Sequence, residues 1–153
     1  MEYRKAELND IPQINELYRQ FYQYHAKLQP AYCRPATESG NYPKQIIESP
    51  DADIIVAAEK DVICGFAHLS ESQTLPYPSI IPHRYALLVD LYVLPERRKL
   101  GIGNALMAAC KAWALERNLE YLELKVLAEN AIALSFYQQQ GFTPAYSTLR
   151  LKI

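Results

Sequence analysis

The sequence has 153 residues, of which 50% are hydrophobic and 22% are charged, and its formal net charge is −1. This composition is typical of a soluble globular protein, and the near-neutral charge excludes a global basic surface for nucleic acid or an anionic membrane. The length fits one domain over residues 1–153, and the absence of an apolar run of about 18 residues predicts no membrane span.

The N-terminal residues and the cysteines indicate the compartment. The first residues, MEYRKAELNDIPQ, are polar and charged, and they lack the apolar core of a signal peptide. Cys33, Cys64 and Cys110 are widely spaced and form no CxxC pair, so they predict reduced thiols and no zinc site. We therefore expect a cytoplasmic protein.

The first third of the chain predicts a strand, a helix and a loop. Residues 2–6 read as a strand, after which Asn9 or Asp10 can cap a helix. Its apolar positions recur at helical spacing, at Ile11, Ile14, Leu17, Tyr18, Phe21 and Tyr22. Residues 29–43 contain three prolines and a glycine and predict a loop, with a short helix expected at 44–48.

The middle of the chain predicts three strands. Two apolar runs within residues 53–70 flank the polar triplet EKD and indicate a hairpin. Residues 73–83 contain three prolines and predict a loop or an irregular edge. Residues 84–95 are almost continuously apolar, which predicts a central strand buried on both faces and ended by Pro95.

The last third predicts helix, strand, helix and strand. Apolar residues mark one helical face from Ile102 to Trp113, and residues 119–126 alternate as a strand does. Residues 130–140 read as a helix stopped by Gly141, and residues 145–153 as a closing strand. This order indicates a mixed α/β or α+β domain with a largely antiparallel sheet and a parallel portion near the two late helices.

Two glycines join the long apolar strand to the next helix. The amides of a first helical turn lack intrahelical acceptors and face the positive end of the dipole, where they can bind phosphate. Gly101 and Gly103 allow close approach, and Arg98 and Lys99 add positive charge. The segment is a candidate anion site, and the alternative is an ordinary glycine turn with solvated cations.

Two nucleotide-binding motifs are excluded at this position. The dinucleotide pattern needs a third glycine where Leu106 stands. The P-loop needs Lys and Ser or Thr after its last glycine, whereas Asn104 and Ala105 follow Gly103.

The segment VLPERRKLGIGNALM resembles the acetyl-CoA-binding segment of the GNAT superfamily of N-acetyltransferases. The family signature Gln/Arg-x-x-Gly-x-Gly/Ala matches at Arg98, Gly101 and Gly103. A second signature matches downstream at Asn130, Ala133, Tyr137, Gly141 and Phe142. The match runs from about Leu87 to Phe142, and it departs from the common RGKG loop, which is RKLG here.

This resemblance implies a fold and a donor. The fold is GNAT-like, with a mostly antiparallel sheet of six to seven strands, a splayed parallel pair and about four helices. The donor is acetyl-CoA, with CoA as product, and the Val93 amide polarises its thioester where the strands splay. The implied cofactor-binding residues are Leu91, Tyr92, Val93, Arg98, Lys99, Leu100, Gly101, Ile102, Gly103, Asn104, Asn130 and Tyr137.

The catalytic candidates each have a structural alternative. Tyr137 matches the family's general acid, although a tyrosine is more commonly a packing residue. Asn130 is placed to bond the cofactor arm or to cap a helix, and both can hold. Asp90 can bind an ammonium group or accept its proton, or it can pair with a nearby cation. The chain's histidines, which titrate near neutrality, are eligible as bases: His25, His68 and His83.

The function implied is transfer of an acetyl group to a primary amine, favouring a small molecule such as a polyamine or an amino-acid derivative. A protein N-terminus or lysine is the alternative acceptor. A non-catalytic acyl-CoA-binding regulatory module is the rival from another class, and a nucleotide-binding protein is a weaker one. We expect no metal, no nucleic-acid partner and no membrane partner, and a homodimer is one option. Acceptor choice is assigned to the N-terminal half and to the loop from Gln73 to Arg84.

Overall fold

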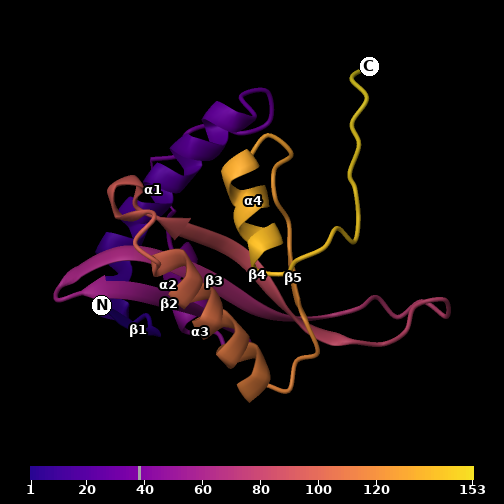
Figure 1. Cartoon of the computed structure of the whole chain (residues 1–153), viewed down its shortest axis with the longest axis horizontal. Helices are drawn as coiled ribbons and strands as arrows, with labels where there is room; N and C mark the ends of the chain where they lie inside the picture. Colours follow the sequence, from indigo (N-terminus) through magenta and orange to yellow (C-terminus); the bar gives the residue numbers. More distant parts are fainter. Residues whose placement is uncertain (38) are drawn as a thin grey trace.

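The computed structural model describes residues 1–37 and 39–153, in which five strands form one sheet in the order β1-β2-β3-β4-β5 (Figure 1). The first four pair antiparallel with their neighbours, whereas β4 and β5 are parallel. The strands are β1 (Glu2–Lys5), β2 (Ala52–Glu59), β3 (Val62–Gln73), β4 (Arg84–Val93) and β5 (Leu122–Leu124).

Helices cover both faces of the sheet. One face carries α1 (Ile11–Leu28) and α2 (Tyr42–Ile47), and the other carries α3 (Ile102–Glu116) and α4 (Ala131–Gln139). Short 3-10 turns precede α1 and follow β4, at Leu8–Asp10 and Pro95–Arg97. The mixed architecture predicted from the sequence, with its mostly antiparallel sheet, parallel pair and four helices, is confirmed.

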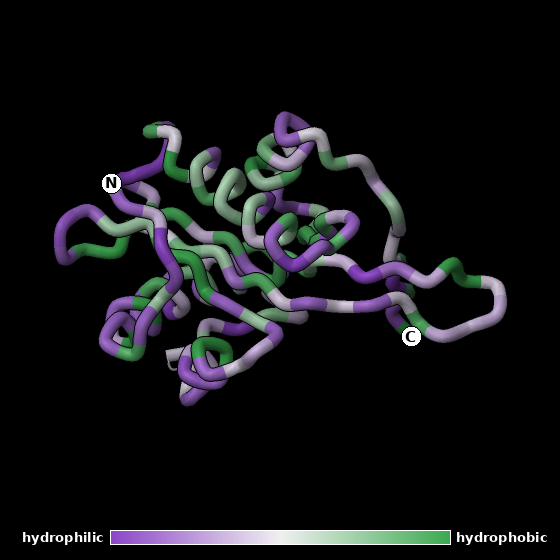
Figure 2. The backbone as a smooth tube through the Cα atoms, turned by 90° about the horizontal axis from the view of Figure 1, so that it is seen from below, coloured by the Kyte–Doolittle hydropathy of each residue, from purple (hydrophilic) through white to green (hydrophobic). Residues whose placement is uncertain are grey.

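Two hydrophobic clusters fill the space between these layers. Beneath α3, the apolar face of the helix packs on the strands through Ile102, Leu106, Met107, Cys110 and Trp113. Beneath α1 and α2, the core is aromatic, with Tyr18, Phe21, Phe66 and Tyr92 in contact. Figure 2 shows hydrophobic residues along the central strands and hydrophilic ones at most turns. The candidate site therefore lies on a scaffold buried on both sides.

The N-terminal elements follow the sequence pattern, with one correction at the predicted cap. Asp10 occupies the position before α1, but its carboxylate makes no cap bond to that helix. It accepts hydrogen bonds instead from the Glu7 amide at 2.8 Å and from the Arg4 guanidinium at 2.6 Å. The predicted loop 29–43 contains Glu38, which lies outside the described residues, and α2 begins two residues earlier than expected.

The prediction that β4 is buried on both faces holds only in part. Only Ala86 and Leu88 on one face and Tyr92 on the other are buried in this strand, and the residues between them are half-buried. The reason is that β4 lies next to a three-residue edge strand, so its final residues have no neighbour on one side. The apolar run reflects a strand that borders a groove as well as the core.

The predicted sixth strand is absent from the described sheet, which has five strands rather than six or seven. Residues 143–153, called the C-terminal segment below, are extended but pair with no strand. Figure 1 shows this segment running away from α4 to the C-terminus. Its alternating pattern made it competent to be a strand, but pairing also requires an available sheet edge beside it.

None of the helices in the described residues is long and apolar enough to cross a membrane.

Candidate active site

The strands β4 and β5 separate halfway along β4. Their parallel pairing ends at Leu88 and Leu124, after which β4 continues to Val93. The chain that leaves β5 runs away from β4 to the start of α4, as Figure 1 shows. A groove of about 1980 Å³ opens here, lined by residues 89–93, by the start of α3, by α4 and by the end of α1. The splayed parallel pair implied by the resemblance is therefore present.

A bulge in β4 determines what faces this groove. Leu88 pairs with Leu69 and Asp90 with His68, so Val89 is an extra residue without a partner in β3. Beyond the bulge the alternation of side chains is inverted. Leu91 and Val93 pack toward the cluster under α3, whereas Tyr92 is buried in the aromatic cluster under α1. Only backbone atoms of Tyr92 are therefore open to a ligand on the α3 side.

The bulge also turns two amides toward the open edge. Before it, the Ala86 amide donates to the Tyr121 carbonyl on the β5 side. After it, the Leu94 amide donates to the Cys64 carbonyl on the β3 side. Because successive amides of a strand point to opposite edges, the N–H groups of Leu91 and Val93 face the edge that β5 has left. This edge offers donors to an extended ligand.

The start of α3 forms the second part of the groove. Gly101 is its N-cap residue, with φ at +82°, a conformation that glycine adopts without strain. The amides of Ile102, Gly103 and Asn104 lie in the first turn, where a helix supplies no acceptor. Among the described residues no other group accepts from them. This is the donor set that a phosphate group needs.

The cations before this turn have different positions. The Arg98 Nε group donates to the Val93 carbonyl at 3.0 Å, and its guanidinium lies between the rings of Tyr24 and Tyr92, less than 6 Å from each centroid. Arg98 thus holds the end of β4 against α1, a structural role that spacing alone did not reveal. Lys99 adopts a positive φ of 61°, and Leu100 is exposed, so this loop presents mainly backbone.

Gly103 serves helix packing as well as access. A Cβ atom at this position would lie 3.3 Å from the Phe136 ring of α4. The missing side chain therefore lets α4 lie against the start of α3. The Nε2 group of the Gln140 side chain also donates to Oδ1 of Asn104 there, at 2.9 Å. Glycine is therefore required for a different reason at each position. At Gly101 it allows the left-handed backbone conformation, and at Gly103 it allows the close contact with Phe136.

Tyr137 of α4 lines the groove and is half-buried. Its ring packs between Phe136 and Phe142, with centroid distances of 5.5 and 5.6 Å. Burial raises the pKa of Tyr137 well above its ordinary value of 10.0, and the nearby Cys110 and Asp90 act in the same direction. The phenol is therefore a protonated hydrogen-bond donor throughout the neutral range.

Asn130 is a buried N-cap, as the structural alternative predicted. Its Oδ1 accepts from the Ala133 amide at 3.2 Å and from the Tyr24 hydroxyl at 3.1 Å. It thereby fixes the start of α4 to α1 across the groove. Both bonds use Oδ1, so the Nδ2 group can still donate to a ligand.

Asp90 lies on the α1 side of the groove, where the bulge directs it. Its Oδ2 atom accepts from the Tyr18 hydroxyl at 3.2 Å and lies 3.5 Å from Nδ1 of His68. His68 in turn lies 3.3 Å from the Tyr42 hydroxyl. Burial raises the pKa of Tyr42 to about 12, and the charge of Asp90 adds to that shift. Asp90 is thus a carboxylate held from behind by Tyr18 and His68 and open to the groove.

Most of the predicted site residues line one groove. The exceptions are Leu100, Ile102 and two of the three histidines. Neither Leu100 nor Ile102 lines it, because Leu100 faces solvent and Ile102 is buried. His25 borders the groove, and burial lowers its pKa, whereas His68 lies behind Asp90. The sequence did not predict the hydrogen bonds of Tyr18 to Asp90 and of Tyr24 to Asn130. These bonds depend on how α1 crosses the sheet, which no local pattern shows.

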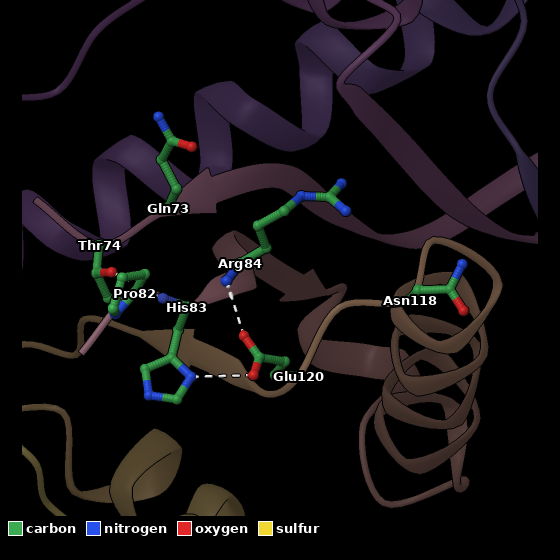
Figure 3. A pocket seen from close by; sticks show the side chains of 7 residues that line it. All are labelled: Gln73, Thr74, Pro82, His83, Arg84, Asn118 and Glu120. Atoms are coloured by element: carbon green, nitrogen blue, oxygen red, sulfur yellow. Dashed lines mark hydrogen bonds and ion pairs between the residues drawn. The ribbon is translucent and has the colours of Figure 1, made fainter. Parts of the chain in front are cut away.

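The loop assigned to acceptor choice lies elsewhere. Residues of the β3–β4 connection line a separate pocket of about 260 Å³ rather than the groove. Figure 3 shows that His83 and the Arg84 amide both contact Glu120 there, at 3.1 and 2.9 Å. Among the described residues, none between 73 and 84 lines the groove, so that part of the expectation is not supported.

Comparisons with known proteins agree with this geometry. The Acetyltransferase (GNAT) family matches residues 11–142. An uncharacterized N-acetyltransferase of Bacillus subtilis, YhfO, is 30% identical over 145 residues, which cover 93% of this chain and 89% of that protein. The chain therefore belongs to the GNAT family of acetyltransferases.

Two solved structures show the same fold. A tetramutant of the BH1408 protein from Bacillus halodurans is 22% identical, with a TM-score of 0.93 and full coverage of both chains. The aminoglycoside N-acetyltransferase AAC(6')-Iy in complex with CoA is 17% identical, with a TM-score of 0.76 and coverage of 99% and 98%.

Proposed function

We propose that this protein transfers the acetyl group of acetyl-CoA to a primary amine of a small molecule. The observation that carries the proposal is the composition of one groove. Unpaired helix-start amides, an open strand edge, the phenol of Tyr137 and the carboxylate of Asp90 all border it. These are the groups that holding a thioester, receiving an amine and protonating a thiolate require.

The residues present fit the donor at two points. The first-turn amides of α3, from Ile102 to Asn104, would hold the diphosphate, with Lys99 adding positive charge. The Leu91 and Val93 amides would pair with the amide-containing arm along the open edge of β4. The groove is large enough for a ligand of this size, since ordinary ligand pockets occupy roughly 300–1,000 Å³. When bound, acetyl-CoA supplies a thioester carbon that an uncharged amine can attack.

Asp90 is proposed to receive the amine. A carboxylate beside aromatic rings favours an ammonium group, and the charge on Asp90 is not cancelled by a cationic Lys or Arg in the described residues. Asp90 would then accept the proton that the amine gives up as its nitrogen bonds to the acetyl carbon. Tyr18 and His68 orient this carboxylate from behind.

Tyr137 is proposed to serve the leaving sulfur as the C–S bond breaks. Its raised pKa keeps the hydroxyl protonated, so it can donate a hydrogen bond to the developing thiolate. The Val93 N–H group would donate to the carbonyl oxygen as negative charge develops there.

A small-molecule acceptor is favoured over a protein. Support comes from the site, where Asp90 is half-buried between aromatic side chains rather than on an open surface. AAC(6')-Iy, which shares the fold, is named for acetylating aminoglycosides, which are small amines.

The three free cysteines, Cys33, Cys64 and Cys110, suit the reducing cytoplasm that we propose as the location.

The test is thiol release from acetyl-CoA with a panel of polyamines, amino-acid derivatives, aminoglycosides and peptides. We expect release with a small primary amine and a mass increase of one acetyl group on that amine. Release with peptides alone would shift the assignment to a protein acetyltransferase. Binding of acetyl-CoA without release on any acceptor would favour a regulatory module and contradict the proposal.

A further inference from the structure

The side of α1 that lines the groove presents uncharged side chains. Phe21, Tyr24, His25 and Leu28 lie there at spacings of three and four residues, so they form one row along the helix, called the α1 stripe below. None of the charged residues of α1 lines the groove. Burial lowers the pKa of His25, although the charge of Asp90 opposes that shift, so His25 is uncharged at neutral pH. The stripe is roughly 10 Å long.

Asp90 lies beside the α1 stripe and is flanked by aromatic rings. Its carboxylate accepts from the Tyr18 hydroxyl, and the Tyr18 ring has the rings of Tyr22 and Tyr42 at centroid distances of 5.5 and 5.7 Å. Burial raises the pKa of Tyr22, and the charge of Asp90 adds to that shift, as it does for Tyr42. Because these phenols are uncharged at neutral pH, an ammonium group would meet one carboxylate among aromatic rings, which favours a cation.

The two other carboxylates that line the groove in the described residues offer no second ammonium site near the first. Glu129 accepts from the Gln29 side chain at 2.7 Å, just beyond the end of α1. Tyr18, the partner of the first carboxylate, stands eleven residues earlier, about 16 Å along the helix. Glu123 lies on β5, and the cationic Lys125 lines the groove two residues further on, so the charges of that wall balance.

We propose that the acceptor is an arylalkylamine, a primary amine with one positive charge and an apolar body, whose ammonium group binds Asp90 and whose body lies along the α1 stripe. The inference rests on the proposed function of the groove and narrows its acceptor class. Polyamines and aminoglycosides carry further ammonium groups, which would lose water against Phe21 and Leu28 without gaining a partner. An apolar ring would instead remove these half-buried and buried side chains further from water.

Equilibrium binding of amines to the protein loaded with CoA tests the proposal, because binding requires no turnover. Phenylethylamine and putrescine are matched ligands, since each has a primary ammonium group on a short chain and the far end is either a ring or a second charge. In calorimetric titrations we expect the Kd of phenylethylamine to be lower by roughly tenfold or more, because the second ammonium group is desolvated without a partner. Equal binding of the two, or tighter binding of putrescine, spermidine or an aminoglycoside, would overturn the inference.

A variant at the end of the α1 stripe tests where the body of the amine lies. Leu28→Glu adds a carboxylate one turn beyond His25, so we expect the ratio of the two Kd values to move toward putrescine by roughly tenfold. Leu115→Glu is the matched control, because Leu115 is an exposed leucine of α3 that does not line the groove, and the ratio should stay as in the wild type. A folded Leu28→Glu protein with an unchanged ratio would contradict the proposed placement.

Failure of this inference and failure of the proposed acetyl transfer would give different results. Acetylation of putrescine or of an aminoglycoside in preference to phenylethylamine would overturn the acceptor class and leave the transfer chemistry intact. Selective binding of phenylethylamine without thiol release from acetyl-CoA would support the acceptor class and contradict the transfer.

Discussion

Tyr137 can donate a hydrogen bond to sulfur more readily than it can surrender a proton. The pKa of its phenol is raised by burial above 10.0, whereas an ordinary thiol has a pKa of about 8.5. Full proton transfer to the thiolate is therefore uphill even after the sulfur's bond to the acetyl group is broken. The phenol is best placed to stabilise charge on sulfur in the transition state, which affects kcat rather than ground-state binding.

Replacing Tyr137 by Phe removes the donor and keeps the ring between Phe136 and Phe142. We expect kcat to fall by about 10²-fold, the usual contribution of a positioned proton donor, with the Kd for acetyl-CoA unchanged. Steady-state kinetics and calorimetric titration measure the two quantities. Tyr77→Phe, in the exposed β3–β4 loop, is the control. An unaltered kcat in Tyr137→Phe would remove the role.

Asp90 is the second residue whose role has a direct test. Asp90→Asn keeps the shape and the bond from Tyr18 but removes the charge that an ammonium group would face. We expect kcat/KM for the amine to fall roughly tenfold to hundredfold, because hydrogen bonds to charged groups contribute about 1.5–3 kcal/mol.

The matched control for Asp90→Asn is Glu120→Gln. Glu120 is also a carboxylate beside a histidine, but it lies in the separate pocket of Figure 3. It should leave kcat/KM unchanged. If Asp90→Asn behaves like this control, then Asp90 neither binds nor deprotonates the amine.

At the scale of elements, the sequence predicted what depends on local pattern. The helix from Ile102, the β2–β3 hairpin and the glycine turn at residue 101 were predictable because periodicity and turn chemistry act over a few residues. The exposed amides of the candidate anion site were predictable for the same reason, since a helix start leaves its first amides without intrahelical acceptors.

What the sequence could not predict depends on pairing between distant segments. The bulge at Val89 lies in a run that is apolar apart from Asp90, without a glycine or proline to mark it. Yet it decides that Asp90 meets His68 and Tyr18 rather than the cluster under α3. The C-terminal segment failed as a predicted strand because alternation shows competence to pair and not where the partner edge lies.

The contact between α3 and α4 gives a prediction at this scale. Gly103→Ala places a methyl group 3.3 Å from the Phe136 ring, which must shift by a few tenths of an ångström. We therefore expect this variant not to gain the roughly 1 kcal/mol of unfolding free energy that alanine otherwise brings over glycine in a helix. Phe136→Leu removes the ring and should relieve that clash. In chemical denaturation, the double variant should be more stable than the sum of the single effects predicts, whereas strict additivity would show that the contact is not tight.

At the scale of the molecule, the site draws on both layers. α1 supplies Tyr18 and Tyr24, β4 supplies Asp90 and Val93, and α3 and α4 supply the helix start and Tyr137. The groove exists because the sheet divides between these layers instead of continuing. The aromatic cluster under α1 borders the groove and is therefore part of both the core and the site. Ionisation of its tyrosine hydroxyls should affect both stability and activity.

Alkaline unfolding should reveal this dual role. Burial raises the pKa of Tyr18 far above 10.0 and that of Tyr42 to about 12, with the charge of Asp90 adding to both shifts. A raised pKa in the folded state stabilises the fold fully below the unfolded value near 10 and progressively less as the pH rises, because the unfolded chain then releases protons that the folded chain keeps. One pH unit above 10, each such tyrosine costs about 1.4 kcal/mol of stability.

We therefore expect the unfolding free energy, measured by urea denaturation between pH 9 and about pH 11, to fall steeply above pH 10. Tyr18→Phe removes one of these titrating groups, so its stability should fall with a shallower slope whatever its value at neutral pH. Tyr146→Phe is the control, because Tyr146 is 86% exposed in the C-terminal segment and should leave the slope unchanged. Equal slopes in wild type and Tyr18→Phe would mean that Tyr18 ionises as easily in the folded chain as in the unfolded one, against its complete burial beside Asp90.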